Sequence, residues 1–209
     1  MITILKNNGL IMKKVSIVVI TLLLISLSSY WYWTTTLSYA LSQIKSSIEH
    51  RDVTTFKEYV DIETLISRFI DDVLEVSYES IGEENNIAKE FGTGLAQLMK
   101  PRMTDFIKER IIRYVENGGT GSHEDDTQIT EGLNLNYEGI FNLEFGQPSY
   151  IENDGKIAYV GFEFYDSEYD TTLSIKTMFR DLGNRWCLVE IANTKSILET
   201  VNRFEEKKD

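Results

Sequence analysis

The stretch that decides the architecture reads KKVSIVVITLLLISLSSYWYW, from Lys13 to Trp33. Its first two residues are basic, and the 19 residues that follow carry no charge. A helix rises about 1.5 Å per residue, so these residues extend about 28 Å, close to the hydrocarbon thickness of a bilayer. The segment therefore predicts one transmembrane anchor over residues 15–33, preceded by a short cytoplasmic tail over residues 1–14.

Both ends of this segment carry residues that are typical of membrane boundaries. Basic residues stay on the cytoplasmic side, and Trp and Tyr prefer the headgroup region. The pattern predicts a single-pass protein of the inner (cytoplasmic) membrane whose C-terminal domain lies outside the cytoplasm. The anchor residues behind this prediction are Lys13, Lys14, Val15, Leu22, Leu23, Leu24, Leu27, Tyr30, Trp31 and Trp33.

Two other interpretations of the segment stay open. A cleaved signal peptide has a similar apolar core, but small residues follow it closely. Here bulky aromatic residues follow, and the nearest suitable site, Ser38-Tyr39-Ala40, lies well beyond the core. A buried helix of a soluble protein would show a polar stripe, whereas Ser16, Thr21 and Ser26 are scattered. Translation can also start at Met12, and that start keeps the anchor.

The rest of the chain is acidic. The first 33 residues contain three lysines and no acidic residue, which leaves 18 basic and 33 acidic residues and a net charge of −15. That charge repels phosphate backbones, so we expect no nucleic acid as a partner; it keeps a domain soluble and favours a basic partner surface. With 209 residues, 42% apolar and 11% aromatic, the chain suits one compact domain plus an appendage and not a disordered polyanion.

Residues 34–117 are predicted to form the helical part of the exported domain. Apolar residues recur three to four positions apart from Leu37 to Ile48, which predicts an amphipathic helix. Asp52 and Asp61 precede two further helical patterns. A carboxylate at such a position accepts the free N–H groups of the first turn, so both residues are predicted N-caps.

A long helical pattern in the second half of this region contains Pro101. Proline lacks a backbone N–H, so we expect it to break or kink the helix. The pattern ends at Asn117-Gly118-Gly119, a strong C-cap signal. Residues 118–132 have almost no large apolar residue and are predicted to form an exposed loop.

Residues 133–209 are predicted to form the sheet and the C-terminal helix of the same domain. The period falls to two after residue 132, which predicts β-strands, and helical spacing returns at Ile197, Leu198, Val201 and Phe204. Apolar and polar residues alternate in four segments, residues 137–145, 158–164, 173–179 and 187–191. Asp154-Gly155 and Gly183-Asn184 are typical of tight hairpin turns. The order of elements predicts an α+β fold, with amphipathic helices packed on a curved antiparallel sheet of about four strands and a short C-terminal helix.

The motifs that resemble catalytic or metal sites are all incomplete. Only His50 and His123 are available for a nucleophilic triad, and no G-x-S-x-G elbow is present. The stretch that begins at His123 lacks the second histidine of a zinc-protease helix. Residues 166–170 space three carboxylates as calcium loops do, but Thr171 and Thr177 replace the turn glycine and the closing glutamate. We therefore predict no catalytic residue, no cofactor and no metal.

Three aromatic residues at strand positions are candidates for lining an apolar cavity between the sheet and the helices. They are Tyr137, Tyr159 and Trp186. Aromatic residues at strand spacing belong to a core more often than to a ligand site, so core packing is the main expectation.

Several short motifs fall between Ser29 and Leu65 and around Trp186. They are Ser29-Tyr30-Trp31, Leu41-x-x-Ile44-x-x-x-Ile48, Arg51-Asp52, Tyr59-Val60-Asp61-Ile62 with Leu65, and Trp186-Cys187-Leu188. They resemble an uncharacterised bacterial family of N-terminally membrane-anchored envelope proteins, a domain of unknown function. The family opens with Tyr-Trp, a run ending in Ala-Ile, an Asp and Tyr-Val-Asp-Phe; Ile62 replaces that Phe here. The resemblance implies a membrane anchor and no known activity.

The order of elements is also similar to cone-shaped nuclear-transport-factor-2-like folds, which include both enzymes and binding modules. Our leading hypothesis is an acidic extracytoplasmic domain that binds or interacts in the envelope, with the bilayer and a protein as partners. Two alternatives stay open, a membrane-tethered hydrolase or isomerase with carboxylates in a cone-like cavity, and a structural subunit of a membrane complex. The oligomeric state also stays open.

These hypotheses predict different structural features. A binding module predicts a closed apolar pocket with few titratable groups. An enzyme predicts a buried carboxylate with a perturbed pKa. A subunit predicts an exposed apolar patch on the helix over residues 37–48.

Overall fold

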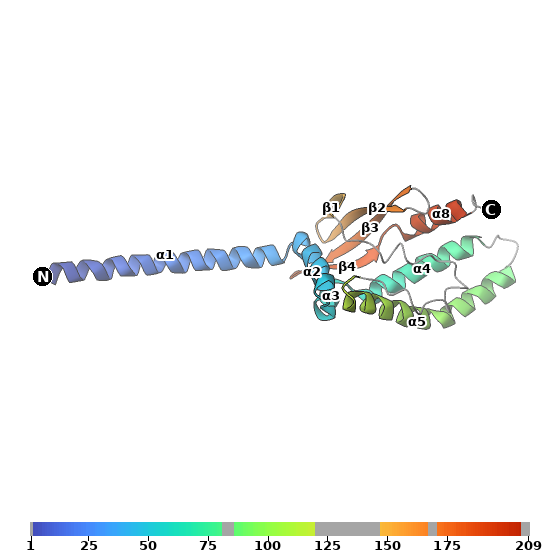
Figure 1. The fold of residues 1–209 in the computed structure, drawn as a ribbon, viewed down its shortest axis with the longest axis horizontal. Coiled ribbons are helices and arrows are strands. Elements are labelled where there is room, and N and C mark those ends of the chain that lie inside the picture. Colours follow the sequence, from blue (N-terminus) through green and yellow to red (C-terminus); the bar gives the residue numbers. More distant parts are fainter. Residues whose placement is uncertain (1, 81–85, 120–146, 167–170, 206–209) are drawn as a thin grey trace.

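The computed structural model describes residues 2–80, 86–119, 147–166 and 171–205. Figure 1 shows one long helix, α1, that projects from a domain built from a sheet and the other helices; α5 packs chiefly on α4 and not on the sheet. The sheet is antiparallel and four-stranded. The predicted α+β fold, with an apolar N-terminal helix and a short C-terminal helix, is therefore confirmed.

Six helices are described. They are α1 (Ile2–Thr34), α2 (Leu37–Glu49), α3 (Val53–Tyr59), α4 (Ile62–Ser80), α5 (Asn86–Glu116) and α8 (Thr194–Glu205). Because α1 begins at Ile2, the residues assigned to a cytoplasmic tail continue the helix that contains the predicted anchor. In α2 the predicted apolar stripe, from Leu37 to Ile48, faces the core.

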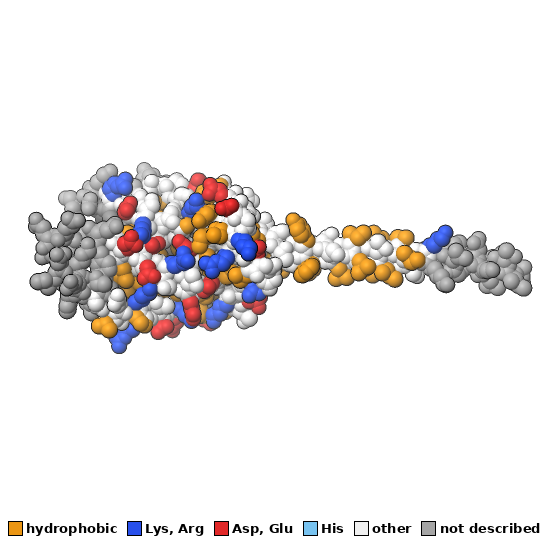
Figure 2. Space-filling model, turned by 180° about the vertical axis from the view of Figure 1, so that it is seen from behind, with side chains coloured by type: hydrophobic (Ala, Val, Ile, Leu, Met, Phe, Trp, Pro, Cys, Tyr) orange, Lys and Arg blue, Asp and Glu red, His pale blue; other side chains and the backbone are white. Residues whose placement is uncertain are grey.

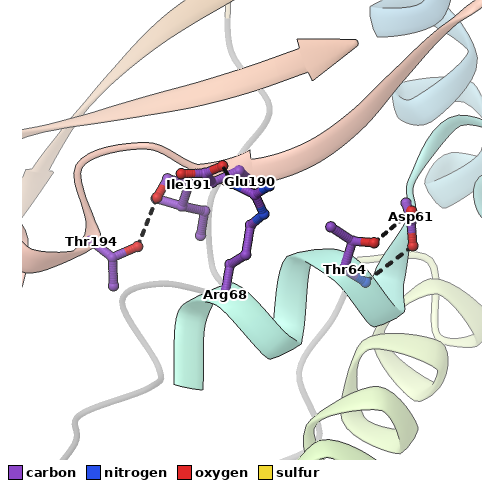
Figure 3. Close-up of polar contacts among 6 residues, drawn as sticks. All are labelled: Asp61, Thr64, Arg68, Glu190, Ile191 and Thr194. Atoms are coloured by element: carbon purple, nitrogen blue, oxygen red, sulfur yellow. Dashed lines mark hydrogen bonds and ion pairs between the residues drawn. The ribbon is translucent and has the colours of Figure 1, made fainter. Parts of the chain in front are cut away.

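The predicted helix caps at Asp52 and Asp61 are confirmed. The Asp52 carboxylate accepts hydrogen bonds from the Thr55 N–H at 3.0 Å and the Thr55 hydroxyl at 2.7 Å. Asp61 makes the same pair of bonds with Thr64, at 3.1 and 2.7 Å (Figure 3). Both sites read Asp-x-x-Thr, so the threonine supplies a second donor to each cap. These caps fix where α3 and α4 begin.

Helix α5 remains one helix across Pro101, and its ribbon bends partway along its length (Figure 1). It ends at the predicted glycines, since Gly118 and Gly119 have φ values of 69° and 82°. The Gly118 N–H donates to the Val115 carbonyl at 3.0 Å, and the Gly119 N–H donates to the Tyr114 carbonyl at 2.9 Å. Positive φ strains any residue with a Cβ, which explains why two glycines end this helix.

The sheet has the strand order β1-β2-β3-β4. Its strands are β1 (Tyr150–Asp154), β2 (Ile157–Asp166), β3 (Thr171–Asp181) and β4 (Trp186–Ile191). Three of them coincide with predicted strands, and both predicted hairpin turns are present, with positive φ at Gly155 and Gly183. The predicted strand over residues 137–145 and most of the predicted loop over 118–132 lie outside the described residues.

Helix α4 is fixed along β4. Val60 forms a parallel bridge with Leu188, and the Asp61 N–H donates to the Leu188 carbonyl at 2.9 Å. About two turns further along, the Arg68 guanidinium pairs with the Glu190 carboxylate (Figure 3). The start of α4 and the middle of α4 are thus both tied to the same strand.

The turn between β4 and α8 is fixed by side chains. The Thr194 hydroxyl donates to the Ile191 carbonyl at 2.8 Å (Figure 3). The Asn193 amide donates to the Ser174 carbonyl at 2.7 Å and accepts from the Lys176 N–H at 2.8 Å. Asn193 therefore continues the pairing with β3 beyond the end of β4 and directs the chain into α8.

The core lies between the helices and one face of the sheet. Its largest fully buried side chains come from α2, α4, α5 and strands β2 to β4: Phe179, Ile44, Ile66, Ile70, Ile175, Val115, Val160 and Val189. The apolar stretch of α1 takes no part in this core.

Candidate functional site

The apolar part of α1, Lys14–Thr34, is long and apolar enough to cross a membrane. These 21 residues have a mean hydropathy of 1.9 and are not buried against the domain. Figure 2 shows hydrophobic side chains along the rod beyond the domain. Predicted anchor residues with described side chains are all exposed: Lys14, Val15, Leu22, Leu23, Leu24, Leu27, Tyr30, Trp31 and Trp33. The Lys13 side chain lies outside the described ones.

The exposed apolar surface is energetically decisive. Ten large aliphatic side chains between Val15 and Leu27 are exposed. Burying one such side chain contributes about 1.5–3 kcal/mol, so transferring the set to an apolar medium contributes on the order of 15 kcal/mol. That is comparable with the whole stability of an ordinary domain, about 5–15 kcal/mol. This part of α1 therefore needs an apolar environment that the rest of the described chain does not supply.

The hydroxyl groups within this stretch are satisfied by the helix itself. The Thr21 hydroxyl donates to the Ile17 carbonyl at 2.9 Å, and the Ser28 hydroxyl donates to the Leu24 carbonyl at 2.8 Å. A polar group in hydrocarbon needs a partner from the protein because no water is present. These two internal hydrogen bonds meet that requirement.

Four consecutive aromatic residues, Tyr30 to Trp33, close the apolar stretch. Successive helix residues are rotated by about 100°, so the four rings point to different sides of α1. Trp31 and Tyr32 are the most exposed, at 75% and 76%. Rings that surround a helix at one level are typical of the headgroup boundary of a membrane.

Three threonines end α1 and start α2. The hydroxyls of Thr34, Thr35 and Thr36 donate to the carbonyls three residues before them, at 2.8, 2.8 and 2.7 Å. The Thr36 hydroxyl also accepts from the Tyr39 N–H at 3.3 Å and caps α2. Sequence reasoning did not single out these residues. The signal was present, since a run of hydroxyl residues between two helical patterns is typical of helix ends.

Aromatic contacts connect α1 with the domain. The rings of Trp33 and Tyr39 pack edge to face with centroids 4.8 Å apart, and those of Tyr39 and Tyr59 do so at 6.2 Å. Burial raises the pKa of Tyr59, and the neighbouring Tyr39 adds to this shift. Edge-to-face pairs contribute about 0.5–1.5 kcal/mol beyond their buried area. The contacts join three helices, so the helical period of any one segment does not reveal them.

The residues predicted to line a cavity do not meet. Trp186 is 6% exposed and packs in the core with Ala158 and Phe179. Tyr159 projects from the other face of the sheet, where the Lys176 ammonium lies 4.3 Å from its ring centre. Tyr137 lies outside the described residues. The strand register thus gives Trp186 a core position and Tyr159 a surface contact.

A small hollow lies between α4, α8 and the sheet. Its lining is apolar apart from one threonine: Phe69, Ile175, Ile191, Thr194, Ile197 and Leu198. Its volume is about 10 Å³, the room that one water molecule needs. We interpret it as a gap in packing and not as a ligand site.

Several titratable groups of the described residues act in structural contacts. His50 Nδ1 lies 2.8 Å from the Ser46 carbonyl at the end of α2. Bonds from the Thr55 N–H and hydroxyl lower the pKa of Asp52. The described residues hold no group of three or more His, Cys, Asp and Glu suited to a metal ion. His123 with its acidic neighbours and residues 167–170 lie outside the described residues.

Comparisons of the chain with protein-family models, with curated proteins and with solved structures find no match. The resemblance to a bacterial envelope family therefore stays a prediction from short motifs. Among the described residues, the exposed apolar helix and its junction with the domain are the features on which a functional proposal can rest.

Proposed function

We propose that the chain is a single-pass membrane protein in which α1 crosses the bilayer and carries the α+β domain outside the cytoplasm. The observation that carries this proposal is that none of the 21 residues Lys14–Thr34, a predominantly apolar stretch, is buried. Lysines 13 and 14 stand at the N-terminal end of this stretch and the rings of residues 30–33 at its C-terminal end, which supports an N-terminus in the cytoplasm. The motifs that resemble the envelope family support the inner membrane of a bacterium as the location.

We propose further that the domain binds or interacts through its surface and does not act as an enzyme. Its net charge of −15, outside the first 33 residues, suits a basic partner. The hollow under α8 is too small for an organic ligand. The carboxylates of Asp52 and Asp61 cap helices, and others pair with lysines and arginines, as Asp71 does with Lys100 at 2.6 Å.

The burial of α2 argues against docking of a membrane complex through this helix, which the structural-subunit hypothesis predicts. Docking through this helix needs an exposed apolar patch, but Leu37, Ala40, Ile44 and Ile48 are all buried within the domain. A protein partner in the membrane would therefore have to contact α1 itself. The proposed interaction surface lies elsewhere, on the polar exterior of the domain.

A reporter enzyme that is active only outside the cytoplasm, fused after Asp209, tests the topology. We expect reporter activity, retention of the full-length mass in membranes, and resistance to alkaline carbonate extraction. Leu23→Arg places a charge in the middle of α1 and costs about 2.5–3.5 kcal/mol of insertion free energy, so it should lower reporter activity and membrane retention.

Leu98→Arg is the matched control, because Leu98 is an exposed leucine of α5, outside the apolar stretch. It should leave both readouts unchanged. A shortened, soluble product with an active reporter would replace the anchor by a cleaved signal peptide. An intact soluble chain with an inactive reporter would refute export altogether.

A further inference from the structure

Two hairpins, β1–β2 and β3–β4, lie side by side at the end of the domain that adjoins α1 (Figure 1). The Asp181 N–H donates to the Lys156 carbonyl at 2.9 Å, which joins the two turns. Ile157 and Arg180 are direct partners in the β2–β3 register, so their side chains lie next to each other on one face. The two turns therefore form one continuous surface.

This surface continues the junction with α1. The main effect on the Tyr59 hydroxyl is burial, which raises its pKa, and the charge of Arg185 in the β3–β4 hairpin acts in the opposite direction. Val60, the residue after Tyr59, bridges Leu188, three residues beyond Arg185, so the β3–β4 hairpin lies near Tyr59. The Tyr59 ring contacts Tyr39, and Tyr39 in turn contacts Trp33. Trp33 belongs to the aromatic end of the proposed span, so the hairpins lie beside the membrane boundary.

The side chains on the hairpins combine cations with exposed apolar groups. We call this set the basic tip: Lys156, Ile157, Arg180, Leu182 and Arg185. Leu182 is 50% exposed and Ile157 is 38% exposed. Lys156 and Arg180 are exposed, and Arg185 is half-buried, with an Nε that has no hydrogen-bond partner. Apolar side chains flanked by Lys and Arg are typical of surfaces that enter a membrane interface.

Several lysines elsewhere in the domain are held in ion pairs, whereas, among the described residues, the cations of the basic tip are not. Lys100, Lys108 and Lys195 pair with helix carboxylates at 2.6, 2.5 and 2.5 Å. Within the described ranges of the chain, the three tip cations form no ion pair. Carboxylates also lie near the tip. Asp154 is exposed, and Asp181 accepts a hydrogen bond from the Gly183 N–H at 2.7 Å. Glu58, also exposed, acts on the same Tyr59 hydroxyl as Arg185.

We propose that the basic tip binds the anionic phospholipid headgroups of the bilayer that α1 crosses. This inference rests on the proposed anchor and adds to it an orientation of the domain. An acidic body is repelled by an anionic surface, whereas unpaired Lys and Arg beside that surface are attracted to it. Leu182, at the turn between the two arginines, enters the interface between headgroups and acyl chains. The contact holds the domain with its hairpins against the membrane.

The test uses the full chain in lipid nanodiscs, with a fluorescent label on the variant Leu182→Cys. Cys187 is buried, and burial raises the pKa of its thiol, so it competes poorly for the label. Lipids with a quencher in the headgroup report contact. We compare discs of phosphatidylcholine with discs that contain about one third phosphatidylglycerol, at low and high salt. Leu98→Cys, an exposed leucine in the far half of α5, is the control label position.

We expect strong quenching at position 182 in the anionic discs, weaker quenching in neutral discs or high salt, and little at position 98. In the double variant Lys156→Glu and Arg180→Glu, the ratio of domains with the tip on the membrane to domains with the tip away from it should fall. The expected fall is at least about fivefold for each cation lost. The matched control, Arg102→Glu with Arg203→Glu, changes the charge equally and should leave quenching at position 182 unchanged.

Each other outcome overturns the inference. Equal quenching in neutral and anionic discs would show contact without headgroup recognition. Equal quenching at positions 182 and 98 would show that the tip has no preference for the membrane. In both cases a chain that inserts into discs keeps the proposed anchor intact. A chain that fails to insert would instead refute the anchor, and with it the basis of this inference.

Discussion

Helices α1 and α4 are both rich in apolar residues, but they place them in opposite ways. In α1 the large aliphatic side chains between Val15 and Leu27 occur on every side and are all exposed. In α4 the apolar side chains share one face and are buried, as Ile66 and Ile70 are, while Glu63 stays outside. The distribution of apolar residues around a helix, more than their number, therefore decides which medium the helix requires.

The largest expected effect separates these two helices directly. Ile66→Ala removes a fully buried side chain of α4 and should lower the free energy of unfolding of the domain by about 2–5 kcal/mol. Leu22→Ala makes a similar truncation in α1 and should leave domain unfolding unchanged. Urea unfolding of the full chain in a mild detergent, followed by circular dichroism, measures both. An equal loss in the two variants would mean that α1 packs on the domain.

A smaller effect is expected at the start of α4. Asp61→Ala removes the cap that accepts from the Thr64 N–H and hydroxyl, and should lower the free energy of unfolding by about 1 kcal/mol. Asp71→Ala is the matched control on the same helix; it breaks only an exposed ion pair with Lys100 and should cost less than about 1 kcal/mol. The cap would lose its assigned role if the control variant were the less stable of the two.

The smallest effect is a pH dependence that the domain has and α1 lacks. Hydrogen bonds from Thr55 lower the pKa of Asp52 from 3.8 in the folded state. The resulting stabilisation is present above the ordinary pKa and is lost as the pH falls through the lower, folded value. Asp52→Asn keeps a capping oxygen without the charge. The stability advantage of the wild type over this variant should shrink as the pH is lowered below about 4.

Retention of the chain in membranes, unlike the stability of the domain, should not depend on pH in this range. The residues from Val15 to Trp33 carry no charged group, so retention of the chain in membranes should not change over the same acidic range. Thermal unfolding at each pH and a carbonate-extraction assay measure the two behaviours side by side. A wild-type advantage that stays constant with pH would contradict the role of Asp52.

Local signals explain what could be predicted from the sequence. The α1 prediction needs only a run of uncharged residues, and the caps at Asp52 and Asp61 need only an acid before an apolar period. The glycines after α5 likewise mark a positive φ that few other residues adopt. Alternation identified β2 and β3 because one face of each is buried along most of its length. In β4 the four consecutive residues Trp186–Val189 are all buried, so apolar residues occupy both faces.

The features that escaped prediction depend on distant contacts. β1 is an edge strand whose residues Ile151–Asp154 are all exposed, so its sequence has no buried period to detect. Tyr159 and Trp186 were paired as cavity candidates although strand register places them on opposite faces. That register includes a bulge between Met178 and Phe179, which no local pattern indicates.

The brevity of the connection between α1 and α2 has a further consequence under the proposed topology. Only Thr35 and Thr36 separate the two helices, and two residues reach at most about 7 Å when extended. Such a short connection keeps the domain next to the membrane, so the domain reaches no further from the membrane than its own diameter. A target in the surrounding space must diffuse to the membrane, or be embedded in it, before this domain can capture it.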